Sequence, residues 1–513
     1  MKTRLTPLAK LLIIAGIIGG LAFTFYKFKD KILPEKDKNE KESANNNNPR
    51  KDDGKTIKIG VVTWGGYAGG QYFNEGFDAN TESRFYKKYG FKVEFKILDD
   101  FVASRNAWKT GEVDLLWATI DAFTTEVASL KEFEPQVIFQ ADWSRGGDAV
   151  VVKRGINSVA ELKGKKVAFA EMTPSHTFLL WLLDAGNLKY SDIKPVKVAS
   201  AIDAADLFKK GKVDAAVVWS PDDADCVAKV SGAKILQNTK NASHIIADVF
   251  IAKKSYVNSH KEMLKNLVRG WFIGAAEINT SNDARIKAAK ILEKGMNQPY
   301  EFCYDAIGNV RLCNYGDNLS FYGLNTSYKG VTGEGIYNKM QEKYEKVGAI
   351  EGQIQSWRII GNASLITANN DMKTMQGQEP EGQKAFSEVT EKDKTKLAIS
   401  TKRVSINFPS GKYTIDENMK TIIDLQFLDI AKSFANARIR IEGNTDNTGS
   451  RAANLKISRQ RAQAVADYLI NEHSFDKNRF IIVGNGPDKP VASNATSKGK
   501  AKNRRTDFEL IAD

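Results

Sequence analysis

Two charged residues near the end of the chain, Asp446 and Arg461, are of types that can together bind a zwitterion, although their spacing alone favours a simple salt bridge. Asp446 directly follows a predicted strand (437–443), and Arg461 lies in the first turns of a predicted helix (455–471). A carboxylate beside a guanidinium can hold an ammonium group and a carboxylate of one ligand, because arginine offers a bidentate fork. The alternative is that the two residues pair with each other as a surface salt bridge, which stabilises a fold by about 0 to 1 kcal/mol.

A second group of candidate residues follows strands predicted further upstream. In α/β proteins, ligands bind at the carboxyl ends of strands, where helix N-termini supply amide donors. The residues expected to bind a small solute there are Trp64, Tyr67, Thr119, Asp121, Trp143, Asp148, Thr173, Ser175, His176, Trp219, Asp222 and Asp248.

Two chemistries suit this group. The aromatic rings can surround a cation, whose charge Asp121, Asp148 or Asp222 balances. Alternatively, the Thr-Pro-Ser-His sequence at 173–176 can hold an anion at the start of a helix. A third possibility is that two of the tryptophans belong to the core and that the domain no longer takes part in transport.

The chain offers little for catalysis. Its four histidines are scattered, with no metal-ligand spacing of His, Cys and Asp and no nucleophile elbow. We therefore expect no enzyme, no metal site and no cofactor. Cys303 and Cys313 flank a turn-rich segment that can close as a disulfide in an oxidising compartment, with Cys226 left over, and three buried free thiols are the alternative.

The elements that must position these residues alternate between strands and helices up to about residue 345, which is typical of an α/β fold. Short β-branched runs predict buried parallel strands at 57–62, 91–98, 113–119, 166–170 and 213–219. After a linker-like stretch, a smaller α+β sandwich is predicted. Its elements are a strand (402–408), a helix (418–434), a strand (437–443), a helix (455–471) and two strands (479–485 and 504–511).

The N-terminal residues indicate the compartment. Basic residues flank an uncharged run from Leu11 to Tyr26, which at 1.5 Å per residue covers about 24 Å of a hydrocarbon core near 30 Å. We expect an uncleaved membrane anchor (1–28), because no convincing cleavage site follows the apolar run. A cleaved signal peptide is the alternative. Residues 29–55 mix charges with an asparagine tract and predict a flexible tether.

The overall charge agrees with an envelope location. The 513 residues are enough for two or three domains, and 75 Lys and Arg outnumber 62 Asp and Glu. This surplus is spread along the chain without a nucleic-acid recognition motif, so no nucleic acid partner is expected. A basic chain is drawn equally to anionic lipid and to an acidic cell wall.

The segments 439–470 (IRIEGNTDNTGSRAANLKISRQRAQAVADYLI) and 479–505 resemble the OmpA-like peptidoglycan-binding domain, across about the last hundred residues. Diaminopimelate in a stem peptide ends in a zwitterion. The resemblance implies that Asp446 takes its ammonium group and Arg461 its carboxylate. It also implies three residues that shape or support the pocket: Thr445, Asn454 and Arg504. Asn444 departs from the histidine that the family often carries there.

The segments 109–123, 146–183 and 208–225 resemble type II periplasmic substrate-binding proteins, of the kind that serve sulfonate, nitrate and thiamine-precursor ABC importers. The resemblance implies two lobes that close on a ligand by a hinge. The expected division is a membrane anchor (1–28), a tether (29–55), a bilobed solute-binding domain (56–345, with lobe 1 at 56–150 and 247–345 and lobe 2 at 151–246), a linker (346–400) and an OmpA-like domain (401–513).

These features predict a single-pass inner-membrane protein with periplasmic domains, which binds peptidoglycan non-covalently and a small solute in its central domain. It would act as receptor or sensor for an inner-membrane transporter or motor complex. One alternative is a structural bridge between inner membrane and cell wall. Another is a wall-anchoring accessory subunit of an ion-driven motor or transport complex, although the apolar run has no acidic residue to carry protons.

Overall fold

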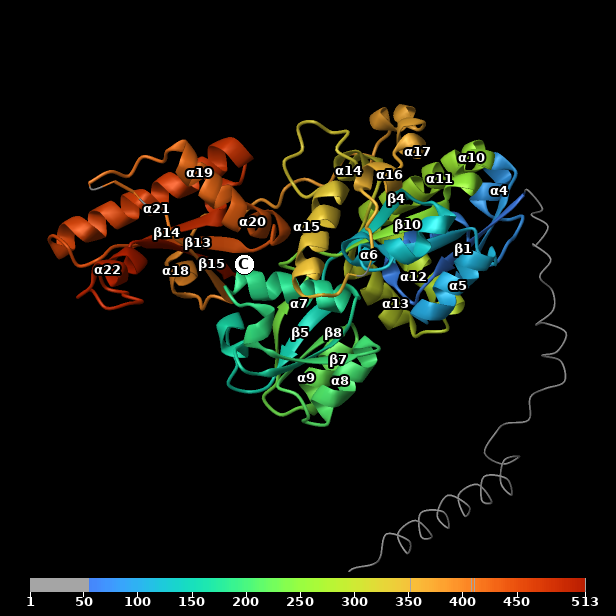
Figure 1. The fold of residues 1–513 in the computed structure, drawn as a ribbon. Coiled ribbons are helices and arrows are strands. Elements are labelled where there is room, and N and C mark those ends of the chain that lie inside the picture. Colours follow the sequence, from blue (N-terminus) through green and yellow to red (C-terminus); the bar gives the residue numbers. More distant parts are fainter. Residues whose placement is uncertain (1–54, 351, 407, 410, 513) are drawn as a thin grey trace, which may run out of the picture. The chain divides into compact units, whose positions relative to one another are not determined.

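The protein is described by a computed structural model that covers residues 55–512 except 351, 407 and 410 (Figure 1). The predicted anchor and all but the last residue of the predicted tether lie outside these described residues. Within them, no helix combines the length and the apolar character that crossing a membrane requires. The described chain builds three β-sheets, which we use to define lobe 1, lobe 2 and the C-terminal domain.

Lobe 1 contains a six-stranded sheet in the order β11-β4-β10-β3-β1-β2. Its strands are β1 (Thr56–Val61), β2 (Lys92–Ile97), β3 (Leu115–Thr119), β4 (Pro135–Ser144), β10 (Ala247–Lys253) and β11 (Val310–Leu312). β1 runs parallel to β2 and β3, whereas β10 is antiparallel to β3 and β4. Its helices are α3 (Ala68–Phe73), α4 (Arg84–Tyr89), α5 (Phe101–Thr110), α6 (Ile120–Phe123), α10 (Lys254–Ser259), α11 (Lys261–Thr280), α12 (Asn282–Met296), α13 (Tyr300–Gly308), α14 (Tyr315–Phe321) and α15 (Gly333–Lys346).

Lobe 2 contains a five-stranded sheet in the order β7-β6-β8-β5-β9. Its strands are β5 (Asp148–Val152), β6 (Lys166–Ala170), β7 (Lys194–Val198), β8 (Ala215–Trp219) and β9 (Lys234–Asn238). Its helices are α7 (Pro174–Ala185), α8 (Ala201–Lys209) and α9 (Asp222–Lys229), which lie around the sheet (Figure 1). The chain therefore passes between the lobes at 145–147, after β4, and again before β10.

The same turn opens one inner strand in each lobe, at 111–114 and at 211–214. In both, a glycine with φ near +75° follows a helix, and a buried valine precedes an aspartate (φ +79° at Gly111 and +72° at Gly211). The aspartate carboxylate accepts the N–H of the neighbouring parallel strand, from Lys58 to Asp114 at 2.8 Å and from Lys166 to Asp214 at 2.9 Å. This repeat sets the register of β3 against β1 and of β8 against β6.

The C-terminal domain contains a four-stranded sheet in the order β12-β15-β13-β14. Its strands are β12 (Ser400–Val404), β13 (Arg438–Asn444), β14 (Phe480–Gly486) and β15 (Arg505–Ile511). Its helices are α19 (Glu417–Ile423), α20 (Asp429–Ser433), α21 (Arg451–His473) and α22 (Ser497–Asn503). One turn of π-helix (Asp424–Leu428) joins α19 to α20, so the helix predicted over 418–434 is not uniform.

Helix α21 lies close against the sheet (Figure 1), because glycines on the strands leave room for its backbone. A Cβ atom at Gly443 would stand 2.1 Å from the carbonyl oxygen of Ser458, and one at Gly484 would stand 2.6 Å from the backbone nitrogen of Arg459. Helix and strands are thereby held at one separation, which fixes the residues at the end of β13 relative to those on α21.

The stretch predicted as a linker is folded against its neighbours. It contains α16 (Trp357–Ile360), α17 (Ser364–Thr367) and α18 (Glu391–Thr395), and Ile360, Leu365, Ile366 and Met372 are buried. Gln378 donates to the Phe272 carbonyl of lobe 1 at 3.1 Å. Further along, the carbonyls of Lys394 and Lys396 accept from Arg440 of β13 at 3.0 and 2.9 Å.

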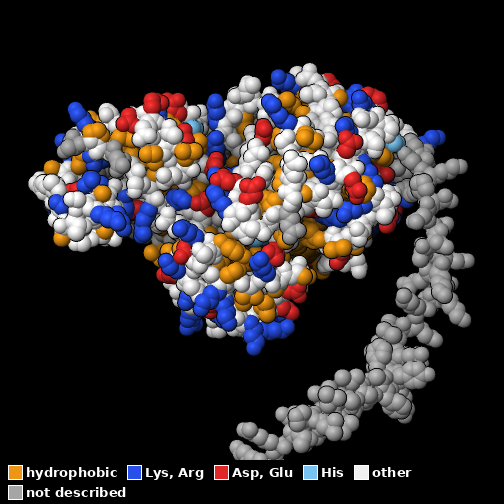
Figure 2. Space-filling view, in the orientation of Figure 1, with side chains coloured by type: hydrophobic (Ala, Val, Ile, Leu, Met, Phe, Trp, Pro, Cys, Tyr) orange, Lys and Arg blue, Asp and Glu red, His pale blue; other side chains and the backbone are white. Residues whose placement is uncertain are grey.

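The surface carries charges of both signs, and the three cysteines lie in the interior. On the face shown in Figure 2, basic and acidic side chains intermingle, and basic ones gather over the tip of lobe 2 near α8 and α9. No single basic stripe runs across that face. Cys226, Cys303 and Cys313 are free and buried, so the disulfide alternative between Cys303 and Cys313 is not what the structure contains.

Candidate functional site

The predicted zwitterion site lies at the end of β13. Asp446 is buried, and its Oδ2 accepts from Nη1 of Arg504 at 2.6 Å, while its Oδ1 accepts from the Thr448 N–H at 2.8 Å. Burial alone would raise the pKa of Asp446, but the hydrogen bonds from Arg504 and Thr448 outweigh it and lower that pKa. The carboxylate is therefore ionised at neutral pH and has a positive charge beside it.

Arg461 lies in the middle of α21 rather than in its first turns, because the helix begins earlier, at Arg451. Its guanidinium donates to the carbonyls of Lys412 and Pro409 at 3.0 and 3.1 Å and stands 4.9 Å from the centre of the Phe408 ring. Burial lowers its pKa, the positive charge of Arg504 adds to this, and Asp446 acts in the opposite direction.

Asp446, Arg461 and Arg504 thus lie close enough to act on one another electrostatically. No direct hydrogen bond joins Asp446 to Arg461 among the described contacts, and Arg504 takes the place that the salt-bridge alternative gave to Arg461. The two remaining predicted residues shape the connecting turn. The Thr445 hydroxyl donates to the Asp446 carbonyl at 2.8 Å, and Asn454 Nδ2 donates to the Thr448 carbonyl at 3.0 Å.

The predicted solute residues of lobe 1 meet across three strands. Thr119 on β3 lies directly opposite Asp248 on β10, and Asp248 lies opposite Asp142 on β4. Tyr67 donates to Asp248 at 2.5 Å, and the indole N–H of Trp64 donates to Asp142 at 2.8 Å. Asp142 was missed by the sequence analysis, although it precedes Trp143 directly in the chain.

A β-bulge at Ala141 determines which residues of β4 share a face. The pairing partners of β4 skip Ala141, so Asp142 shares a face with Asp248, whereas Gln140 and Trp143 lie on the opposite face. Trp143 accordingly departs from its predicted place. Its ring contacts His244 at 5.0 Å and Phe321 at 6.3 Å between centroids, away from the carboxylates.

Four buried aspartates, Asp121, Asp142, Asp148 and Asp248, form what we call the carboxylate cluster, at the strands where the chain passes between the lobes. Asp121 Oδ1 accepts the Ala247 N–H at 3.3 Å, and Asp148 Oδ2 accepts the Ser144 hydroxyl at 2.7 Å. Asp121 Oδ2 and Asp142 Oδ1 are buried without a hydrogen-bond partner among the described residues.

Burial dominates the electrostatics of this cluster. It raises the pKa of Asp148 and of Asp248 to about 7, and it raises the pKa of Asp121 and of Asp142 well above the ordinary value. Neighbouring carboxylates raise these pKa values further, so ionising any of the four aspartates is costly. Arg105 opposes the rise at Asp248, but its guanidinium already donates twice to Glu126, at 2.7 and 2.8 Å.

Protein groups use part of the hydrogen-bonding capacity of the predicted anion site at 173–176, while the Ser175 hydroxyl and the Nε2 of His176 have no partner among the described residues. The Thr173 side chain accepts the Ser175 N–H at 3.2 Å, and the Tyr344 hydroxyl of α15 donates to the Thr173 carbonyl at 3.3 Å and contacts the Thr177 hydroxyl at 2.8 Å. Ser175 and His176 are buried. Burial lowers the pKa of His176 to about 3, with Lys197 adding to the effect, so the ring is neutral.

Trp219 and Asp222 lie in lobe 2, at the end of β8 and the start of α9. Both are half-buried, and Trp219 lies opposite Asp148 in the β5–β8 pairing, with its ring 6.5 Å from that of Phe101. Asp222 opens α9, and burial raises its pKa. No group of three or more His, Cys, Asp or Glu side chains within residues 55–512, as described, is arranged to hold a metal ion.

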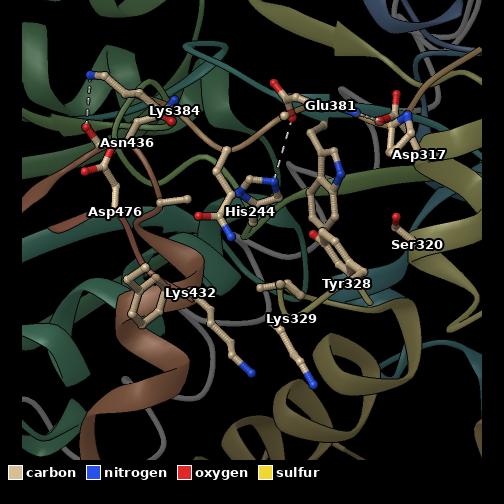
Figure 3. A pocket seen from close by; sticks show the side chains of 18 of the residues that line it. His244, Asp317, Ser320, Tyr328, Lys329, Glu381, Lys384, Lys432, Asn436 and Asp476 are labelled. Carbon is tan, nitrogen blue, oxygen red and sulfur yellow. Dashed lines mark hydrogen bonds and ion pairs between the residues drawn. The ribbon is translucent and has the colours of Figure 1, made fainter. Parts of the chain in front are cut away.

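A cavity of about 390 Å³ lies on the other face of β4 (Figure 3). Lobe 1 contributes Gln140, Trp143, Phe321 and Tyr328, and the C-terminal domain contributes Lys432, Phe475 and Arg479. In Figure 3, Glu381 stands next to His244 at the top of the cavity, and the Nε2 of His244 lies 3.8 Å from the Glu381 carboxylate. None of the predicted solute residues except Trp143 lines it.

Residues 407–504 match the OmpA family, and residues 76–280 match the NMT1/THI5-like family. The chain is 38% identical over 112 residues to outer membrane porin F of Pseudomonas aeruginosa, which covers 22% of this chain and 31% of porin F. It is 47% identical over 80 residues to peptidoglycan-binding protein ArfA of Mycobacterium tuberculosis, which covers 16% of this chain and 24% of ArfA. The chain thus spans less than a third of the length of these two relatives.

Among solved structures, the chain resembles a periplasmic sulfonate-binding protein, SsuA, from Methylobacillus flagellatus. The TM-score is 0.50 at 16% identity, and the match covers 65% of this chain and 99% of that protein. At this identity the likeness shows the fold, which is that of a bilobed α/β periplasmic binding protein. The chain is therefore a fusion of an NMT1/THI5-like domain of this fold with a C-terminal OmpA-family domain.

Proposed function

We propose that this chain is a cell-envelope binding protein that attaches to peptidoglycan by its C-terminal domain and binds a small organic cation with its bilobed domain. The wall attachment is supported by the meeting of Asp446, Arg461 and Arg504 at the end of β13. A zwitterionic amino acid offers an ammonium group to Asp446 and a carboxylate to Arg461 or Arg504. The relative ArfA is named a peptidoglycan-binding protein, and residues 407–504, which include these three side chains, match the OmpA family.

The observation that carries the choice of a cation is the carboxylate cluster. Four aspartates are buried together, two of their oxygens have no partner among the described residues, and Arg105 is committed to Glu126. A bound protonated amine would favour the ionised form of these carboxyl groups, and the rings of Trp64 and Tyr67 lie beside them. The anion alternative has fewer free donors than the sequence suggested, because Thr173 accepts the Ser175 N–H and Tyr344 donates to the Thr173 carbonyl. The Ser175 hydroxyl is left without a partner among the described residues.

This function requires the two lobes to move relative to each other. The carboxylate cluster is buried, so a solute enters when the lobes open about the crossings at 145–147 and before β10. We propose further that the apolar run 11–26 anchors the chain in the inner membrane. The protein would then present its solute to a membrane complex from a position fixed to the wall, as a receptor and not as an enzyme.

Thermal shift of the full chain tests the solute class. Putrescine, spermidine and choline are compared with methanesulfonate and nitrate. A bound solute at 100 times its dissociation constant stabilises the protein by about 2.7 kcal/mol. The Asp142→Asn variant should lose this shift, while Asp305→Asn, at an exposed position in the same lobe, should keep it. Stabilisation by methanesulfonate or nitrate alone, or by no member of the panel, would refute the proposal.

Co-sedimentation with purified peptidoglycan tests the wall attachment. Asp446→Ala and Arg461→Ala should each abolish it. Arg451→Ala is the matched control, because Arg451 also lies on α21 but is 68% exposed and pairs with Asp488 at 2.6 Å. Retained sedimentation of both Asp446→Ala and Arg461→Ala would show that the zwitterion is bound elsewhere.

A further inference from the structure

The cavity on the far face of β4 has the walls of a small-molecule site. Its volume of about 390 Å³ falls within the range of pockets that hold organic ligands. Aromatic side chains line it from separate segments of the chain. They are Trp143, Phe321, Tyr328, Phe386 and Phe475. Flat apolar walls of this kind suit a ligand with an aromatic body.

The cavity and the carboxylate cluster lie on opposite faces of β4. The bulge at Ala141 places Gln140 on the same face as Trp143, toward the cavity, while Asp142 points to the opposite face. Gln140 is fully buried, and its Nε2 donates to the Asp142 carbonyl at 3.1 Å. Its Oε1 has no partner among the described residues, so an acceptor is available inside the cavity.

The acidic side chains that line the cavity all form ion pairs or hydrogen bonds within the protein. Glu381 pairs with Arg145 at 2.6 Å, and Asp317 pairs with Arg311 at 3.0 Å. Asp476 accepts the N–H groups of Phe386 at 3.1 Å and of Asn478 at 2.8 Å. Each of these carboxylates therefore already has ion-pair or hydrogen-bond partners within the protein.

Several basic side chains that line the cavity also form hydrogen bonds within the protein. Arg479 donates to the carbonyls of Ala431, Phe434 and Ala437 at 2.7 to 2.9 Å, and Lys384 donates to the Asn436 carbonyl at 3.4 Å. His244 is neutral, because burial, with Arg145 and Arg479 adding to it, lowers its pKa well below the ordinary value.

Two basic side chains of the cavity, Lys329 and Lys432, differ from these groups. Neither has an ion pair or hydrogen bond among the described contacts, and Figure 3 shows the two side chains reaching in the same direction from different elements. Burial lowers the pKa of Lys432; Asp429 and Asp424 oppose this, and the positive charge of Lys329 adds to it. Asp429 already pairs with Lys339 at 3.2 Å, and Asp424 accepts from Tyr468 at 2.9 Å.

We propose that this cavity binds a small organic anion with an aromatic body. The anionic group lies between Lys329 and Lys432, the body lies among the aromatic walls, and a donor on the ligand reaches Gln140 Oε1. The site is separate from the solute site and from the wall site of the proposed function. It also joins lobe 1 to the C-terminal domain, so a ligand there contacts both.

Matched probes test the charge requirement. Isothermal titration of the full chain compares indole-3-acetate with indole-3-acetamide, and phenylacetate with phenylacetamide, because each pair differs in charge but hardly in shape. At least one acid should bind about tenfold or more tightly than its amide, as two charge-assisted contacts warrant. Binding of neither acid, or equal binding of acid and amide in both pairs, would overturn the proposal.

Variants then assign the site. The double variant Lys329→Met with Lys432→Met should reduce the affinity for the acid to that for the amide. Lys212→Met, at an exposed position of lobe 2, should leave both unchanged. Asp142→Asn, on the other face of β4, should also leave the acid affinity unchanged. An acid affinity that survives the double variant, in a protein with the wild-type melting temperature, would place the anion elsewhere and refute the assignment.

Discussion

Replacing Asp184 by asparagine removes a carboxylate that ties three elements together. Asp184 lies in the last turn of α7 and accepts from Lys343 of α15 at 2.5 Å and from Lys402 of β12 at 2.6 Å. The two lysine side chains are only 10% and 16% exposed. Burial alone would raise the pKa of Asp184, but the two ammonium groups outweigh it and lower that pKa to about 2.

The magnitude follows from this pKa. A shift from 3.8 to about 2, at about 1.4 kcal/mol per unit, corresponds to about 2.5 kcal/mol of folding stability. Since the carboxylate is itself 32% exposed, solvent screening reduces this to about 1 to 2 kcal/mol. We expect Asp184→Asn to lower the melting temperature at pH 7 by about 2 to 4 °C per kcal/mol.

The pH dependence provides the sharper test. Because the pKa is lower in the folded state than in the unfolded state, the stabilisation is complete above pH 4 and is lost as the pH falls through 2. Thermal unfolding of the wild type, Asp184→Asn and the exposed control Asp305→Asn should therefore converge toward low pH. An Asp184→Asn variant as stable as the wild type at pH 7, or a difference that persists unchanged at pH 2, would contradict this reasoning.

Three further predictions concern the interior. Gly443→Ala places a Cβ 2.1 Å from the Ser458 carbonyl oxygen and should destabilise the C-terminal domain by about 1 to 3 kcal/mol in urea unfolding. The control Gly382→Ala places a Cβ with nothing within 4 Å and should be neutral. Equal unfolding midpoints of the two variants would argue against the close approach of α21. His176 has a folded pKa of about 3, so the stability of the wild type should fall as the pH drops below about 6.5 and that of His176→Gln should fall less steeply; equal slopes would show that the ring is not buried. The three cysteines are buried, and burial raises the pKa of two of them to about 11, so a thiol reagent at pH 8 should label them only in denaturant; rapid labelling of the native protein would refute their burial.

The sequence by itself determined the kinds of element and their order. Alternating β-branched runs and amphipathic stretches are local patterns, and they predicted strands and helices near their observed places in both lobes and in the C-terminal domain. The turns at 111–114 and 211–214 are likewise local, because a glycine, a valine and an aspartate suffice to build them. The placement of Asp446 after β13 is local in the same sense.

The tertiary structure decided which side chains meet. Arg504 lies 58 residues from Asp446, and Tyr344 lies 171 residues from Thr173, so no local pattern links either pair. One bulged residue, Ala141, placed Gln140 on the same face of β4 as Trp143 and opposite to Asp142, which the sequence pattern alone did not indicate. Backbone preferences are set within a few residues, whereas the partner of a buried polar group depends on which distant segments pack against it.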